Sequence, residues 1–89
     1  MIYKINILEN ANDDLNTLRR NDKNSYIKAF DLVREIMVSP RSGTGKPERL
    51  KYFEKEVYSR RINHKDRLVY TIYESIKEID ISSFIGHYS

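Results

Sequence analysis

The fold of this chain is decided by residues 57–84, which read VYSRRINHKDRLVYTIYESIKEIDISSF. β-Branched and aromatic residues gather in three runs, over residues 57–62, 67–73 and 76–84, and such residues favour strands. The runs are joined by polar links of only a few residues. Links this short connect antiparallel neighbours, because a parallel crossover needs a dozen or more residues. The stretch therefore predicts a three-stranded antiparallel meander.

The segment before the meander predicts one strand and two helices. Residues 2–8 alternate between apolar and polar side chains, as a half-buried strand does. A first helix is expected from Asn10, among capping and acidic residues, to the break at Asn21. A second is expected from about Asn24 until Pro40 stops it. Its apolar stripe recurs at three- and four-residue spacing and contains Tyr26, Ile27, Phe30, Val33, Ile36 and Met37.

The order β-α-α-β-β-β predicts an α+β fold. We expect an antiparallel sheet with the two N-terminal helices packed on one face, because each apolar helix stripe must be buried against a sheet. A chain of 89 residues fits a single domain over residues 1–89. The glycine-containing segment between residues 41 and 47 reads as a loop.

Composition narrows the chemistry and the compartment. The chain has no cysteine, which removes disulfides and thiolate chemistry and favours the cytoplasm. Neither a signal peptide nor an apolar run of about 20 residues is present, so we expect no membrane partner. The two histidines and the scattered acids show no metal-ligand spacing, so we expect no metal and no cofactor.

Positive charge is concentrated in the middle of the chain. Residues 41–67 contain nine Lys or Arg against four Asp or Glu, a balance of +5, whereas the whole chain carries +3. A concentrated basic window attracts polyanions more strongly than the same charge spread evenly. Taken from the residues alone, this is a small basic domain that is expected to meet nucleic acid.

Four residue types in the second half could together cleave RNA without a metal. Glu48 follows Lys46 and a proline and is the candidate general base, because neighbouring cations favour its ionised form. His87 is the candidate acid, since histidine titrates near neutrality. Arg67 can brace two phosphate oxygens at once. Tyr88 could stack on a base or touch the phosphate, or simply pack at the rim.

The blocks that contain these residues resemble the Txe/YoeB branch of the RelE-like toxins. The resemblance runs from about Pro40 to Tyr88 and rests on the blocks GTGKPERLK from Gly43, SRRI from Ser59, DRLVY from Asp66 and the terminal His87-Tyr88. It implies a RelE-like fold and the toxin of a type II toxin–antitoxin system. The implied activity is that of an mRNA interferase, a ribosome-dependent endonuclease (hydrolase) that inhibits translation by cutting mRNA in the decoding site.

The resemblance also implies residue roles. Glu48, Arg67 and His87 are the implied catalytic residues: base, transition-state stabiliser and acid. The implied RNA-binding residues are Lys46, Lys51, Arg61 and Tyr88. Strand alternation puts Arg60 and Arg61 on opposite faces, and the choice of Arg61 rests on the resemblance alone. This chain continues to Ser89, one residue beyond the tyrosine that ends many relatives.

Partners follow from the resemblance in the same way. It implies a YefM/Axe-type antitoxin with a flexible acidic tail, the 70S ribosome with its mRNA, and operator DNA reached through the antitoxin complex. A homodimer is also compatible with it. Two alternatives stay open: a binding toxin of the ParE kind that acts on gyrase without cleaving RNA, and an inactive relative that only pairs with an antitoxin.

Overall fold

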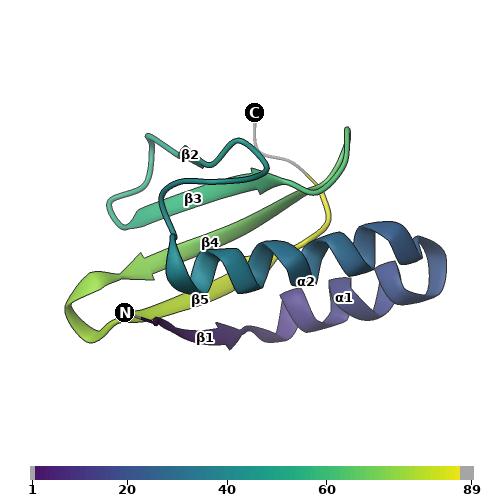
Figure 1. Cartoon of the computed structure of the whole chain (residues 1–89), viewed down its shortest axis with the longest axis horizontal. Helices are drawn as coiled ribbons and strands as arrows, with labels where there is room; N and C mark the ends of the chain where they lie inside the picture. The colour runs from purple at the N-terminus through teal and green to yellow at the C-terminus, as the bar shows by residue number, and fades with distance from the viewer. Residues whose placement is uncertain (1, 87–89) are drawn as a thin grey trace.

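Two helices cover one face of a five-stranded sheet in the computed structural model, which describes residues 2–86 (Figure 1). The elements follow in the order β1 (Lys4–Ile7), α1 (Glu9–Asn21), α2 (Lys23–Val38), β2 (Glu48–Arg49), β3 (Glu56–Arg61), β4 (Arg67–Tyr73), the 3₁₀ turn η1 (Glu74–Ile76) and β5 (Glu78–Ser83). The α+β architecture expected from the sequence is confirmed. Neither helix within residues 2–86 is long and apolar enough to cross a bilayer.

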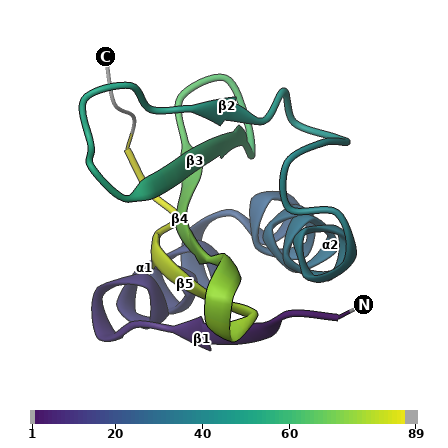
Figure 2. The ribbon, with the colours of Figure 1, turned by 90° about the vertical axis from the view of Figure 1, so that its left-hand side faces the viewer.

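The sheet is mixed, and this corrects the expectation of a wholly antiparallel one. Its strand order is β1-β5-β4-β3-β2, and β3, β4 and β5 form the predicted antiparallel meander. However, β1 pairs with β5 in parallel, from Lys4 opposite Glu78 to Ile7 opposite Ile81. The helices and the meander together supply the long connection that a parallel pair requires. Seen end on, β1 and β2 lie at opposite ends of the twisted sheet (Figure 2).

Two short elements depart from the sequence-based expectation. The strand β2 was not predicted: it forms directly after the predicted loop of residues 41–47, and it pairs Glu48 with Ser59 of β3. At the other end of the meander, β5 begins at Glu78 instead of Ile76. The preceding residues form η1, and Lys77 then takes a left-handed backbone conformation with φ of 55°. Both differences involve only a few residues, and the predicted topology of the meander is unchanged.

The core lies between the helices and the sheet. On α1 the buried residues are Ala11, Leu15 and Leu18, at the spacing of one helix face. On α2 they include Leu32 and Ile36, whereas Ile27, which the apolar stripe also included, is 58% exposed. The sheet contributes the buried side chains Leu68, Tyr70, Ile72, Ile79 and Ile81. The stripe therefore overlapped the buried face at Val33 and Ile36, but it included the exposed Ile27 and omitted the buried Ala29 and Leu32.

A polar cluster joins the start of the sheet to η1 and to the segment after α2. The Glu74 carboxylate accepts hydrogen bonds from the Tyr3 hydroxyl at 2.7 Å and from Arg41 at 2.9 Å, and it pairs with Lys77. These contacts, with Lys77 the largest contributor, lower the pKa of Glu74 to about 2. Arg41 also pairs with Glu56 of β3 at 2.6 Å. Through Arg41, the cluster holds the start of the loop that leads into β2 against β3 and η1.

We predict that Leu32→Ala lowers the free energy of unfolding by about 2–5 kcal/mol, because Leu32 is only 1% exposed and its loss leaves a cavity. The matched control is Ile27→Ala on the exposed side of α2, which should change stability by less than about 0.5 kcal/mol. Urea unfolding followed by circular dichroism measures both. Equal losses in the two variants would contradict the assignment of the buried helix face.

The second prediction concerns acid stability. Because the pKa of Glu74 falls from 4.5 to about 2 on folding, its contribution is present above the unfolded value and is lost as pH falls through the folded one. Glu74→Gln should therefore lose less stability than the wild type between about pH 6 and about pH 2. Urea midpoints across this range measure the difference, with exposed Glu9→Gln as the control. Identical pH profiles for Glu74→Gln and wild type would contradict the cluster's role.

Candidate phosphate-binding site

The site begins with the alternation of side chains along β3. Tyr58 packs against the core and Arg60 is buried, whereas the intervening Ser59 and the terminal Arg61 belong to the opposite face of the sheet. Residues paired directly across neighbouring strands share a face. Glu48 is paired with Ser59, and Arg61 is paired with Arg67 of β4. The register therefore brings one carboxylate and two guanidinium groups to the face without helices.

These side chains line a hollow of about 300 Å³. Its lining residues are Lys46, Pro47, Glu48, Arg61 and Arg67. The structure thus brings together four of the seven residues selected from the sequence. Lys51 is exposed in the turn after β2 and does not line the hollow. His87 and Tyr88 lie outside the described residues.

The electrostatics of the hollow favour an anion. Arg61 and Arg67 face each other across the β3–β4 pair, an arrangement of like charges that costs stability. Lys46 adds a third cation, and Glu48 is the only acid in the lining, so the balance is +2. Among residues 2–86, no carboxylate lies within ion-pair distance of these three cations. A phosphodiester in the hollow would relieve this repulsion and could accept paired hydrogen bonds from arginine.

Glu48 is the carboxylate that lines the hollow. Its side chain is exposed, and its carboxylate makes no hydrogen bond to another residue within residues 2–86. Lys46, two residues earlier, adopts a left-handed conformation with φ of 52°, and Pro47 then fixes the backbone that enters β2. An ionised carboxylate with unused lone pairs, on the rim of a cationic hollow, can accept a proton from a substrate hydroxyl.

The described chain ends beside Arg67. The Arg67 amide donates to the Gly86 carbonyl at 2.8 Å, and the Gly86 amide donates to the buried Asp66 carboxylate at 3.0 Å. One helix contributes as well: Asp14 of α1 accepts hydrogen bonds from the amides of Phe84 and Ile85. The residue immediately before His87 is therefore held against the backbone of Arg67.

Sequence reasoning did not select two residues beside the hollow. Arg60 is 0% exposed, and its guanidinium points away from the hollow into a set of hydrogen bonds on the helix side. Ser59 is 1% exposed, and its hydroxyl has no hydrogen-bond partner within residues 2–86. Strand alternation already indicated that Ser59 shares a face with Arg61. No sequence signal distinguished Arg60 from Arg61, because which face the helices cover is a tertiary property.

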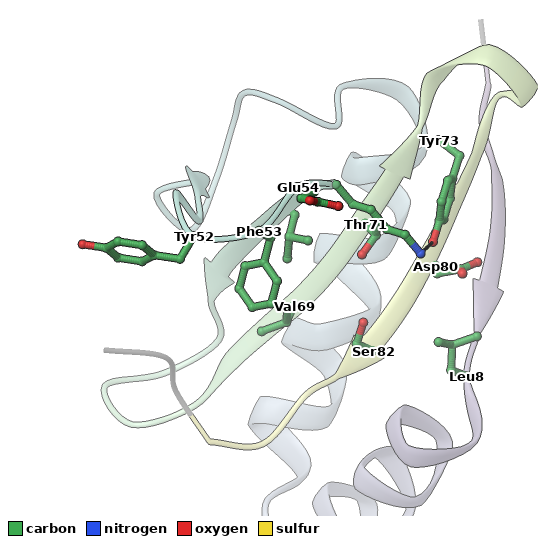
Figure 3. Close-up of a pocket in the computed structure, with 11 residues that line it drawn as sticks. Leu8, Tyr52, Phe53, Glu54, Val69, Thr71, Tyr73, Asp80 and Ser82 are labelled. Carbon is green, nitrogen blue, oxygen red and sulfur yellow. Dashed lines mark hydrogen bonds between the residues drawn. The ribbon is translucent and has the colours of Figure 1, made fainter.

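A second hollow of about 400 Å³ lies on the same face of the sheet (Figure 3). Its floor includes Val57, Val69 and Thr71, and the segment after β2 forms its side. Phe53 lies over Val69, whereas the Tyr52 ring points away from the sheet and is 98% exposed. The lining is largely apolar, and its charges are mixed: Glu54, Lys55 and Asp80. It lacks the net positive charge that makes the first hollow suited to a phosphate.

No metal-binding cluster accompanies either hollow in the described part of the chain. Residues 2–86 contain no group of three or more His, Cys, Asp or Glu side chains close enough to hold an ion.

Known proteins share both the sequence and the architecture. The family model for the YoeB-like toxin of bacterial type II toxin-antitoxin systems matches residues 8–88. Toxin YoeB of Synechocystis sp. is 38% identical over 85 residues, which cover 96% of each chain. The YoeB dimer from Staphylococcus aureus is 37% identical, with a TM-score of 0.86, over 99% of this chain and all of that one.

Two further solved structures extend the comparison. The YoeB chain of the heterotetrameric YoeB-YefM toxin-antitoxin complex from Staphylococcus aureus is 37% identical, with a TM-score of 0.81, over 99% of this chain and all of that one. An archaeal RelE-RelB complex from Pyrococcus horikoshii is only 18% identical, and its TM-score of 0.74 over 97% of this chain and 96% of that one shows a shared fold. The chain therefore belongs to the family of YoeB-like toxins of bacterial type II toxin–antitoxin systems, and its fold is RelE-like.

Proposed function

We propose that this toxin is a ribosome-dependent mRNA endonuclease. The observation that carries the proposal is the hollow in which Glu48 stands among Lys46, Arg61 and Arg67. RNA supplies its own nucleophile, the 2′-hydroxyl, so the protein needs a base, an acid and positive charge around the phosphate. A pure binding surface has no need of a carboxylate among its phosphate-binding cations, because that carboxylate repels the ligand.

In the proposed reaction Glu48 accepts the proton of the 2′-hydroxyl. The 2′-oxygen then attacks the adjacent phosphorus, and the bond from phosphorus to the 5′-oxygen of the next nucleotide breaks. Arg67 donates hydrogen bonds to the phosphate oxygens, whose negative charge grows in the transition state. His87 gives a proton to the departing 5′-oxygen. The products are a 2′,3′-cyclic phosphate, which hydrolysis opens to a 3′-phosphate, and a 5′-hydroxyl.

The other cations of the site bind and orient the message. Arg61 is exposed at the end of β3 directly opposite Arg67, and Lys46 lines the same hollow. Lys51 and Tyr88 would contact the flanking phosphates and bases. The ribosome contributes by holding the message in a bent, reactive geometry, since alignment of the reacting atoms lowers the barrier substantially. The protein acts in the cytoplasm in this scheme, where translating 70S ribosomes are found.

The basic face also fits the partners that we propose for this toxin. YoeB from Staphylococcus aureus occurs in a heterotetrameric complex with YefM and also as a dimer. We infer a YefM/Axe-type antitoxin for this chain, whose acidic segment would occupy the hollow and relieve the repulsion between Arg61 and Arg67. The same complex would contact operator DNA, and free toxin would form a homodimer.

We predict that Glu48→Gln and Arg67→Ala each slow cleavage strongly while leaving the fold intact. Loss of the base should slow cleavage by about 10²–10⁴-fold, and loss of the guanidinium by about 10²–10³-fold. The measurement is 5′-end mapping of a defined message on translating ribosomes, with His87→Ala beside them. Wild type should cut within the decoding-site codon, and the variants should not.

The matched controls are Glu9→Gln and Arg19→Ala, which change exposed residues of α1. Both should cut as the wild type does. A folded Glu48→Gln variant with full activity would remove Glu48 from the mechanism. A wild type that poisons cells without cutting the message would favour a binding toxin that acts on gyrase or another target.

We also predict that binding of single-stranded RNA weakens with salt, because phosphate contacts release counterions. The probe is an oligonucleotide with a 2′-deoxy residue at the cleavage site, so that binding is measured without cleavage. Arg61→Ala should reduce the slope of log affinity against log salt by about 1. Arg19→Ala on α1 should leave the slope unchanged. A slope that Arg61→Ala does not alter would place the phosphate contacts elsewhere.

A further inference from the structure

The buried arginine beside the hollow uses every hydrogen bond that it can donate. A guanidinium has five N–H donors. Those of Arg60 reach the Tyr70 hydroxyl at 3.0 Å, the Glu35 carboxylate at 2.7 Å, and three backbone carbonyls at 2.6, 2.8 and 3.2 Å. Its side chain is 0% exposed, so it has no contact left for a phosphate. This residue therefore has a role different from that of its neighbour Arg61.

The three carbonyls all belong to the loop between α2 and β2. They are those of Ser39, Ser42 and Thr44. This loop has no regular secondary structure, and a buried carbonyl without a donor would be costly. One guanidinium thus replaces the hydrogen bonds that a helix or strand would have supplied along the loop.

Two partners of Arg60 hold the same loop independently. The Tyr70 hydroxyl, which accepts from Arg60, donates to the Pro40 carbonyl at 2.6 Å. The Glu35 carboxylate, which also accepts from Arg60, accepts the Thr44 amide. That amide hydrogen bond is the main reason why the pKa of Glu35 lies below its ordinary value. Gly43 passes so close that a Cβ there would lie 1.9 Å from the Glu35 carboxylate.

The loop leads directly into β2, whose first residue is Glu48, and so determines where Glu48 lies in the hollow. Near the end of the loop, the Gly45 carbonyl accepts a hydrogen bond from the Arg61 amide at 2.7 Å, and Glu48 follows three residues later. Gly45 has φ of 84°, and a Cβ there would lie 2.9 Å from the Arg61 carbonyl. The strand β2 contains only two residues, so its own pairing with β3 fixes Glu48 weakly. The place of the carboxylate therefore depends on where the loop is anchored.

We propose that Arg60, with Glu35 and Tyr70, forms a positioning cluster that holds the loop of residues 39–45 so that Glu48 stands in the same hollow as Arg67. The cluster lies on the helix side of the sheet and the hollow on the open side, so it acts on the reaction through the backbone. This inference rests on the proposed RNA cleavage, since it assigns residues that set the place of the proposed base.

The test compares Arg60→Lys and Tyr70→Phe with the wild type. Lysine keeps the charge but has three donors in place of five, and phenylalanine removes the hydroxyl that links Arg60 to Pro40. The control is Ile79→Val, which shortens a fully buried side chain on β5, a strand that is not paired with β3. It costs stability without touching the loop.

Single-turnover cleavage on ribosomes separates positioning from stability. Per folded molecule, Arg60→Lys should cut about 10²-fold more slowly, because displacements of about 1 Å have effects of this size. Tyr70→Phe should slow the reaction less but in the same direction. The ribosome concentration for half-maximal rate should change by less than about twofold, since the cations that bind RNA stay in place. Ile79→Val should keep the wild-type rate.

Hydrogen–deuterium exchange supplies a readout that does not depend on cleavage. Amides of residues 41–46 should exchange faster in Tyr70→Phe than in the wild type, and those of β4 should not. Wild-type cutting rates in folded Tyr70→Phe and Arg60→Lys, with unchanged exchange in the loop, would overturn the positioning cluster. A wild type that does not cut RNA at all would instead overturn the proposed function, and with it the catalytic purpose of the cluster.

Discussion

The register between β3 and β4 is the constraint on which the rest of this structure depends. It places Arg60 opposite Leu68 on the helix side and Arg61 opposite Arg67 on the open side. A shift of one residue would exchange the two faces. It would bring Arg61 into the core and remove Arg60 from the loop that it anchors. The backbone hydrogen bonds between β3 and β4 therefore set both the anchoring of the loop by Arg60 and the place of Arg61 in the hollow.

The two arginines of β3 show how burial gives the same side chain two uses. Arg60 is desolvated, and it is tolerated because the Glu35 carboxylate and four neutral oxygen acceptors satisfy its donors. Arg61 is exposed and faces another cation, so its charge is uncompensated within the described residues. Unpaired cations weaken the folded state slightly and strengthen its attraction to a polyanion. On the open face, the repulsion between these cations lowers the stability of the fold slightly and raises the positive potential that attracts a polyanion.

Much of the fold was predictable because it rests on local patterns. The run of residues 67–73 was predicted with the bounds that β4 has, and α2 differs from its prediction by about one residue at its start. The parallel pairing of β1 was not predictable, since it depends on which sheet edge is left free after the meander forms. The exposure of Ile27 and the burial of Leu32 were missed for a similar reason: which side of an apolar helix is buried depends on its packing against α1 and the sheet.

The sequence by itself determined the order of the two helices and of the strands β1, β3, β4 and β5, the concentration of positive charge and the short set of candidate site residues. It did so because periodicity, turn length and residue chemistry are local. Only the tertiary structure decided that Lys46, Glu48, Arg61 and Arg67 share one hollow, and that Arg60 holds the loop behind it. Those decisions depend on which sheet face the helices cover, and that is settled by burial of apolar surface across the whole molecule.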